Sequence, residues 1–406
     1  MSSFSWLDYS EHDRRQALDV IDLFRERETV DELGIGSIRD ALADLLFPGT
    51  STIQSRARYF LFIPWMYQKL ERKKVPSSEI TERARKEEIA LIDTLAESDD
   101  SFGTIGVRAR KGLRRLPTHI YWMGIGTWGI RLYPGSQDQY HRSLDRYYEG
   151  RDSVPRTDDG EPMLGARPRN WHAALPASPE GFPIGASLAL HRREADFLRD
   201  RIVHRVPATL LAFMVDHDIA PEDVDFPWEH PRYADFPAAN QAELEHARCF
   251  SEAMHGAQLL YNLVLADLRE WQEKRDEFGE RIEEWADMMG QRRRQHLSWD
   301  RADFWKCAKR GGLRLRAPTQ TFVDRWLAIS IDRGETDLAV HREARALIVE
   351  REQQLKRGQA RVNRGRPLDA WGGDSGSRPL DYRWNAIVRQ ILIDIQDGRA
   401  LEDNDA

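Results

Sequence analysis

Three pairs of glutamate and histidine stand at a spacing that helical proteins use to hold metal ions. The pairs are Glu243 with His246, Glu252 with His255, and His191 with Glu194. Two E-x-x-H pairs on different helices build the di-iron sites of helical bundles. Here the pairs at 243 and 252 fall on one predicted helix, and nine steps of about 100° turn the second pair roughly 180° away from the first. A metal site would therefore have to join His191 and Glu194 to Glu243 and His246, as a metal-dependent hydrolase or nuclease would require.

Packed polar groups and helix-surface side chains explain these residues without a metal, and we predict no metal site. The sequence also has no G-x-x-x-x-G-K-[ST], G-x-S-x-G, C-x-x-C or H-E-x-x-H motif. Glu71-x-Lys73 has the letters of a nuclease motif, but it falls at the end of a predicted helix and not on adjoining strands. We therefore assign no catalytic residue and no cofactor, and we favour a non-enzymatic protein over the hydrolase.

Two arginines directly precede the most apolar stretch of the chain. Arg56 and Arg58 stand before an uncharged run of aromatic and aliphatic residues from Tyr59 to Tyr67. A run without a polar face must be buried in the fold or in an interface. Arginine at such a border needs a carboxylate, a phosphate or a row of carbonyls as its partner. We predict that both arginines lie at a buried boundary, and they are candidates for binding a partner or nucleic acid.

Basic clusters give the second lead to function. Arg108, Lys111 and Arg115 would share one face of a helix and could present three charges to a phosphate backbone. Arg361, Arg364 and Arg366 precede a glycine-rich loop that contains Trp371, a combination suited to single strands through charge and stacking. The alternative is a solvated surface neutralised by the 67 acidic residues of the chain. Nucleic acid is thus a candidate ligand, whereas the other tryptophans are expected to pack in the core.

Composition limits the function further. The 406 residues carry a net charge of −7, so no global positive field attracts nucleic acid and any contact must be local. The only two cysteines, Cys249 and Cys307, suit reduced buried thiols better than a disulfide. The chain has no apolar run of the roughly 18 to 20 residues that a membrane span needs, and its N-terminus lacks the features of a signal peptide. We therefore predict a bacterial cytoplasmic protein that makes no membrane contact.

Helical periodicity dominates the elements that must position these residues. We predict a mainly α, multi-helical protein with little or no sheet, in which two helical subdomains are joined by a Pro-rich irregular segment. The predicted divisions are an N-terminal helical domain (1–150), an irregular connection with two helices (151–238), a C-terminal helical domain (239–398) and a disordered acidic tail (399–406). Helices are expected from Ser10, over 37–45, from about 50 through the buried run, over 78–95, 187–204 and 207–217, from 239, over 270–296, 298–310, 318–333 and 336–357, and over 382–395.

Several blocks of the sequence resemble a known bacterial family. They are F-S-W-L-D-Y-S-E-H-D-R-R near the start, the block from D-E-L-G-I-G to R-A-R-Y-F-L-F-I-P-W, H-A-R-C-F-S-E-A-M-H-G-A-Q-L-L-Y-N-L, and L-D-Y-R-W-N near the end. Together they are similar to a domain of unknown function catalogued as family 6361, over nearly the whole chain. The resemblance implies an accessory or scaffold subunit from an antiphage defence or mobile-element locus, with a helicase or nuclease as its protein partner. It implies no catalytic residue.

Overall fold

The chain folds into two compact units, each built from segments that are distant in sequence. The computed structural model describes residues 31–152, 169–334 and 337–401. Unit 1 combines the chain up to Leu46 with Val224–Tyr382, and unit 2 combines Phe47–Asp223 with the chain from Arg383 onward. These units do not follow the linear division predicted from the sequence, because each takes segments from both halves of the chain.

The central element of unit 2 is α3 (Tyr59–Arg72), which contains Pro64. Every residue from Tyr59 to Tyr67 is buried, as the absence of a polar face predicts. Aromatic contacts fill its surroundings: the Phe60 ring stacks on Trp128 with 3.8 Å between centroids, and Tyr59 stacks on Tyr121 at 5.2 Å. The helix therefore forms the core of this unit.

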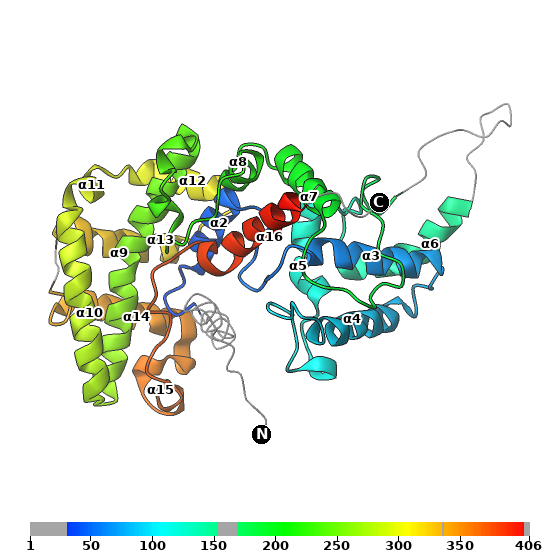
Figure 1. The fold of residues 1–406 in the computed structure, drawn as a ribbon. Coiled ribbons are helices and arrows are strands. Elements are labelled where there is room, and N and C mark those ends of the chain that lie inside the picture. Colours follow the sequence, from blue (N-terminus) through cyan, green and yellow to red (C-terminus); the bar gives the residue numbers. More distant parts are fainter. Residues whose placement is uncertain (1–30, 153–168, 335–336, 402–406) are drawn as a thin grey trace, which may run out of the picture. The chain divides into compact units, whose positions relative to one another are not determined.

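Helices α4, α5 and α6 follow α3 along the chain (Figure 1). Their bounds are Ile80–Ala96, Pro117–Thr127 and Gln137–Asp152. The approach of α5 to the turn before α3 requires glycine at position 124, since a Cβ there would lie 2.2 Å from the carbonyl oxygen of Gly49. The backbones of α5 and of the turn before α3 are therefore in close contact.

The described part of the Pro-rich segment docks on the same unit. An isolated antiparallel bridge pairs Arg131 with Trp171, and the backbone N–H of Leu132 donates to the Asn170 carbonyl at 2.8 Å. Glu71, which is buried in α3, accepts hydrogen bonds from Asn170, Trp171 and Tyr140. The unit is completed by α7 (Arg192–Arg205), α8 (Leu210–Asp216), the π-helical turn η7 (Trp384–Val388) and α16 (Arg389–Ala400).

Unit 1 is organised around α9 (Ala238–Leu268), whose buried residues occupy most of its circumference. Helix α10 (Gln272–Gln291) runs back along it after a short turn, and the two lie side by side in Figure 1. The Trp285 indole N–H donates to the Glu252 carbonyl at 2.8 Å, and the ring lies against Gly256. A helix that is apolar nearly all round is the buried core of a helical unit.

Shorter helices surround this pair. They are α2 (Gly36–Leu46), α11 (Arg293–Ser298), α12 (Arg301–Arg310), α13 (Ala317–Leu327), α14 (Arg342–Lys356) and α15 (Arg366–Asp369), with the π-helical turn η4 (Ala328–Asp332) and the 3₁₀ turns η2 (Pro227–Glu229), η3 (Tyr233–Asp235), η5 (Arg357–Gln359) and η6 (Arg361–Asn363). In unit 2, the 3₁₀ turn η1 spans Arg110–Gly112.

The prediction of a mainly α protein is confirmed, since the described residues form helices and turns and no strand. Helix α3 begins at Tyr59 and not near Thr50, because residues 50–58 form turns. Helix α16 extends to Ala400, two residues into the predicted acidic tail, and residues 402–406 lie outside the described part. The helix predicted from Ser10 also falls outside it. No helix in the described ranges is long and apolar enough to cross a membrane.

Candidate nucleic-acid interface

Arg56 finds its partners inside unit 2. Its Nε lies 2.9 Å from one carboxylate oxygen of Asp394 in α16, and its Nη1 lies 2.8 Å from Asp100. The side chain also donates to the Phe102 carbonyl at 3.0 Å. Burial lowers the pKa of Arg56, but the two carboxylates outweigh it and hold the pKa above its ordinary value. The guanidinium thus joins α16 to the turn before α3 and is not presented to an external ligand.

Arg58 is engaged in the same way by α7. Its Nη2 donates to Glu194 at 2.8 Å, and its Nη1 donates to the carbonyl of Ser187 at 3.0 Å. Arg58 and Glu194 are 3% and 4% exposed. The prediction that both arginines lie at a buried boundary is confirmed, and their charges are neutralised within unit 2.

The predicted metal candidates in unit 1 have protein partners. Glu243 accepts from Asn240 at 3.0 Å and pairs with Arg310 at 3.3 Å. The Trp299 indole N–H donates to Nδ1 of His246 at 3.0 Å. The pair at 252 and 255 contacts other groups, because it lies on the opposite side of α9: Glu252 pairs with Arg292, and His255 lies against the Ser377 carbonyl.

The candidates in unit 2 form the start of α7. His191 and Glu194 make a capping box, in which the Glu194 carboxylate accepts from the His191 backbone N–H at 3.1 Å. Nowhere in the described ranges do three or more His, Cys, Asp or Glu side chains gather in a way that could hold a metal ion. All three histidine–glutamate pairs thus contact other protein groups in the described part of the chain.

The basic segment of unit 2 lies after α4, but it is not the helix that the sequence predicts. Only Arg110–Gly112 is helical, as a single 3₁₀ turn, because Gly106 and Arg110 have positive φ values and Pro117 begins the next helix. The proposed helical face of Arg108, Lys111 and Arg115 is therefore wrong. Arg108, Arg114 and Arg115 are exposed and have no side-chain partner in the described chain, whereas the side chain of Lys111 is outside the described part.

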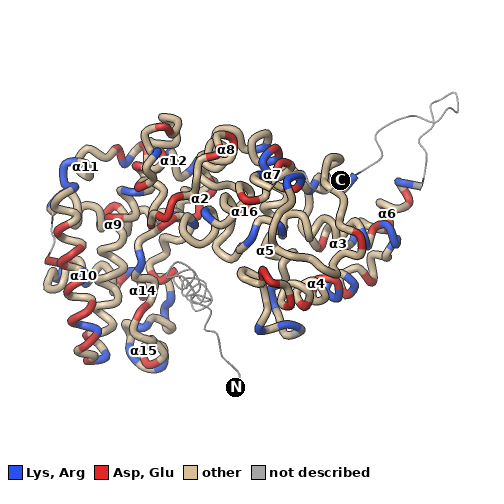
Figure 2. Tube along the Cα trace, viewed as in Figure 1, with Lys and Arg blue, Asp and Glu red and all other residues tan. Residues whose placement is uncertain are grey.

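In unit 1, the turns between α14 and α15 present a second group of arginines. We call residues 357–366 the arginine segment. Arg357, Arg364 and Arg366 are exposed, and their side chains have no hydrogen bond or ion pair within the described residues. From residue 353 to 368 the sequence has five basic residues and no acidic one. Figure 2 shows the Lys and Arg positions along this stretch beside α14 and α15.

A buried carboxylate fixes the backbone of the arginine segment. Glu352 of α14 is completely buried and accepts from the backbone N–H groups of Arg361 and Val362 at 3.1 and 3.0 Å. It also accepts from the Tyr261 hydroxyl of α9 at 2.7 Å. Arg361 points inward as well and forms an ion pair with Glu32. The inner side of the segment is thus neutralised, while its outer side is not.

The outer arginines are held in an uncommon backbone conformation. Arg357 and Arg364 have φ values of 51° and 65°, in the left-handed region that favours glycine. The Asn363 side chain donates to the Arg357 carbonyl at 2.9 Å and accepts from Gln353 at 2.7 Å, which brings the two turns together. Such conformations cost about 1–3 kcal/mol each and persist only where the surroundings enforce them, which is a common property of binding sites.

Trp371 does not have the role that the sequence suggests. It is 2% exposed, and its ring packs on Trp271 with 5.9 Å between centroids. The prediction that Trp371 stacks on bases is wrong, because its ring faces the core of unit 1. Arg364 and Arg366 remain candidate binding residues and Arg361 becomes a structural one. Arg357 belongs to the same basic cluster of the sequence but was not among the predicted binding residues, and nothing in the sequence indicated that Glu352 positions the segment.

Comparison with known proteins gives a family and no closer relative. The model of a family of unknown function, DUF6361, matches residues 1–398. Neither the curated proteins nor the solved structures include a match to this chain.

Proposed function

This chain belongs to the DUF6361 family of unknown function, and we propose that it acts as a non-enzymatic helical subunit that binds the phosphate backbone of nucleic acid. The observation that carries the proposal is the outward set of Arg357, Arg364 and Arg366. These are exposed cations without partners in the described chain, on a backbone that a buried carboxylate holds in place. Exposed arginines that have no ion pair among the described residues and lie on a strained, fixed backbone have the features of a phosphate-binding surface.

The basic segment of unit 2 supports the same function. Arg108, Arg114 and Arg115 are likewise exposed and unpaired among the described residues. Each unit thus carries a group of exposed arginines close in sequence, on a chain whose net charge is −7. Phosphate contacts of this kind give affinity without reading sequence, so we expect binding that depends strongly on salt and little on base composition.

We further propose an accessory or scaffold role in a bacterial defence or mobile-element system, in the cytoplasm, with a helicase or nuclease as the protein partner. The partner class comes from the family resemblance. The two buried free thiols, Cys249 and Cys307, are consistent with a reducing compartment. Co-expression with a helicase or nuclease encoded beside its gene should give a complex that elutes as one species. Separate elution of the two proteins would contradict the partner proposal.

The nucleic-acid proposal is tested by fluorescence anisotropy with labelled single- and double-stranded DNA and RNA over a salt series. The variant Arg357→Gln/Arg364→Gln/Arg366→Gln should bind more weakly, and the slope of log K against log salt should fall by roughly 2 to 3 because about three phosphate contacts are lost. The matched control is Arg232→Gln/Arg301→Gln/Arg333→Gln. These arginines of unit 1 pair with surface carboxylates, so the control has the same net charge as the variant.

An equal loss in both variants would show that only total charge matters and would contradict a defined site. Native protein that binds none of the four nucleic acids at low salt would overturn the function itself. The same samples, supplied with Mg²⁺ or Mn²⁺, report cleavage. Metal-dependent cleavage by the native protein would refute the non-enzymatic proposal in favour of the hydrolase.

A further inference from the structure

The end of α7 in unit 2 brings two arginines and a histidine together. The backbone N–H of His172 donates to the Ile130 carbonyl at 2.8 Å, which places this histidine against the turn that follows α5. Gly129 is the neighbouring residue of that turn, and a Cβ there would lie 2.8 Å from Nε of Arg205. Arg201 lies one helical turn before Arg205, and its Nη1 contacts Nε2 of His172. The three side chains therefore meet around one short stretch of backbone.

Neither of these two guanidinium groups contacts a carboxylate in the described chain. Arg205 has no hydrogen bond or ion pair among the described residues, and the imidazole of His172 is the one side-chain partner of Arg201 there. Burial lowers the pKa of Arg201 and the charge of Arg205 lowers it further, while Asp200 offsets this only in part. The Asp200 carboxylate lies 3.3 Å from Arg199. Two positive charges are thus close together without an anion between them, which is unfavourable.

The imidazole of His172 faces a donor at each of its two nitrogens. The backbone N–H of Ala174 lies 3.2 Å from Nδ1, and the guanidinium of Arg201 lies against Nε2. A neutral imidazole has one N–H and one acceptor nitrogen, so it cannot accept from both groups. Burial and Arg201 lower the pKa of His172, which disfavours the doubly protonated ring. An anion oxygen resolves this conflict, because it accepts from an Nε2–H and from the guanidinium at once.

The helix end explains the presence of one of these charges but not their arrangement. Basic residues in the last turn of a helix are favoured by the partial negative charge of its carbonyl end, and Arg205 is in the last turn of α7. Arg201 lies one turn earlier, and its guanidinium contacts a histidine and not a carbonyl. A ligand that accepts from both arginines accounts for the whole group.

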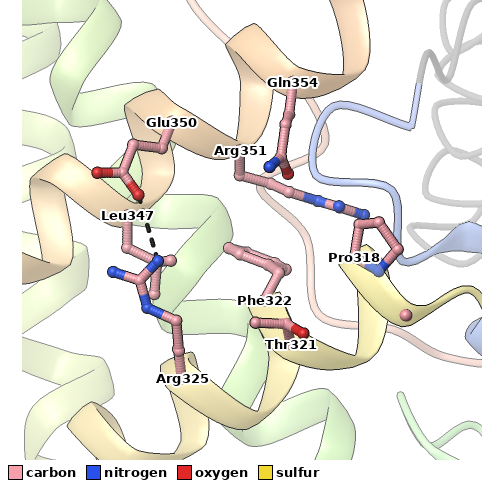
Figure 3. Close-up of a pocket in the computed structure, with 9 residues that line it drawn as sticks. Pro318, Thr321, Phe322, Arg325, Leu347, Glu350, Arg351 and Gln354 are labelled. Carbon is pink, nitrogen blue, oxygen red and sulfur yellow. Dashed lines mark hydrogen bonds and ion pairs between the residues drawn. The ribbon is translucent and has the colours of Figure 1, made fainter.

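Arg351 in unit 1 is the contrasting case of an arginine whose donors are used. Its Nε donates to the Leu33 carbonyl at 2.8 Å, and its Nη2 donates to the Thr319 hydroxyl at 3.0 Å. Figure 3 shows this side chain over the Phe322 ring, beside a cavity between α13 and α14. Neutral acceptors and an aromatic face stabilise Arg351 without an anion, whereas the described residues offer no acceptor to Arg205.

We propose that His172, Arg201 and Arg205 form a binding site for a phosphate group. Arg205 is exposed and the other two side chains are half-buried, so a ligand can reach them from solvent. Two guanidinium groups and an imidazole N–H suit a phosphate, because it offers several acceptor oxygens and guanidinium groups match their spacing. The phosphate belongs either to a nucleic-acid strand or to a small phosphorylated molecule. The site shares no residue with the arginine segment.

The first test is isothermal titration of the full-length protein with inorganic phosphate at constant ionic strength. The native protein should bind phosphate saturably. Arg201→Gln and Arg205→Gln should each weaken binding at least about tenfold, a difference of about 1.4 kcal/mol, because each removes one guanidinium group from the site. The matched control is Arg192→Gln, which should keep the native affinity. Arg192 is at the start of the same helix and lies 3.9 Å from Asp196.

A further variant separates a defined site from a general effect of charge. His172→Ala removes the imidazole donor without removing an arginine, and it should also weaken phosphate binding. Arg205 is exposed, so Arg205→Gln should fold like the native protein, which circular dichroism can check. The proposal would be overturned by native protein that binds no phosphate saturably, by equal losses in Arg205→Gln and Arg192→Gln, or by unchanged affinity in His172→Ala.

Competition separates the two sources of the phosphate. An oligonucleotide that displaces inorganic phosphate, and that binds more weakly to Arg201→Gln than to Arg192→Gln, identifies a phosphate of a strand. An oligonucleotide that leaves phosphate binding unchanged identifies a small phosphorylated molecule as the ligand. The variant with three substitutions in the arginine segment should bind inorganic phosphate like the native protein, so failure of nucleic-acid binding there and failure of this site can be told apart.

Discussion

Replacing Arg58 by alanine tests whether the buried boundary of α3 is structural. The substitution removes the Nη2 contact to Glu194 at 2.8 Å and the Nη1 contact to Ser187 at 3.0 Å. Glu194 is 4% exposed, so water cannot replace the lost cation without opening the packing of α7. Among the described residues, the carboxylate then keeps one hydrogen bond, from the His191 backbone N–H at 3.1 Å, and no cation.

The expected loss follows from leaving a buried charge unpaired. Removal of one partner from a buried ion pair costs about 3–5 kcal/mol. Removal of one partner from an exposed pair costs at most about 1 kcal/mol. We therefore expect Arg58→Ala to lower the free energy of unfolding of unit 2 by about 3–5 kcal/mol. The measurement is equilibrium urea unfolding followed by tryptophan fluorescence and by circular dichroism.

Two further variants separate charge pairing from a general effect of mutation. Arg58→Met with Glu194→Gln removes both charges and should be more stable than Arg58→Ala alone, because no buried ion remains. Arg72→Ala, at an exposed position in the last turn of α3, should change stability by at most about 0.5 kcal/mol. If Arg58→Ala unfolds at the same urea concentration as the native protein yet loses nucleic-acid binding, the ion pair is dispensable for stability and Arg58 is a ligand contact.

Three more perturbations test other parts of the structure. Burial raises the pKa of Glu88 to about 7. Between about pH 4.5 and 7, the folded protein therefore keeps a proton on Glu88 that the unfolded chain has released. The free energy of unfolding should fall by about 1.4 kcal/mol for each pH unit as the pH rises through this range. Glu88→Gln should remove this pH dependence from the free energy of unfolding. If the difference in stability between the native protein and the variant does not change across these pH values, the raised pKa of Glu88 is disproved. Gly124→Ala places a Cβ 2.2 Å from the Gly49 carbonyl oxygen and should lower the melting temperature, unlike Gly112→Ala, whose Cβ meets nothing. Burial raises the pKa of the Cys249 and Cys307 thiols, so iodoacetamide should label them only after denaturation, as mass spectrometry would show; rapid labelling of the native protein would contradict their burial.

Many of the helices were predictable because their sequence patterns are local, although no helix was predicted where α5 and α6 lie. The apolar line of α4 and the long apolar stretch of α9 each follow from side chains within a few turns. The burial of α3 was predictable for the same reason, since nine consecutive residues from Tyr59 to Tyr67 offer no polar face. The start of α3 was not, because the turns before it are fixed by distant groups such as the Tyr121 hydroxyl, which accepts from the Ser55 backbone N–H at 2.8 Å.

The partners of the buried charges could not be predicted from sequence. Arg56 pairs with Asp394, 338 positions away, and Arg58 with Glu194, 136 positions away. The sequence predicts that such arginines need anions, since an unpaired buried guanidinium is costly. It does not say which of the 67 acidic residues supplies them, because that choice depends on how α7 and α16 pack against the start of α3.

Orientation decides what a basic cluster can do, and the arginine segment shows why sequence density does not reveal it. Arg361 and Arg364 are three positions apart and chemically identical, yet Arg361 neutralises Glu32 while Arg364 is exposed. The difference arises from Glu352, which accepts from the backbone N–H groups of Arg361 and Val362 and so fixes the direction of the chain at that point. If Glu352 is what aims the outer arginines, its removal should weaken nucleic-acid binding even though it makes the chain less negative. The loss of a negative charge would by itself strengthen nucleic-acid binding. The affinity of a Glu352→Gln variant for nucleic acid therefore separates the two explanations.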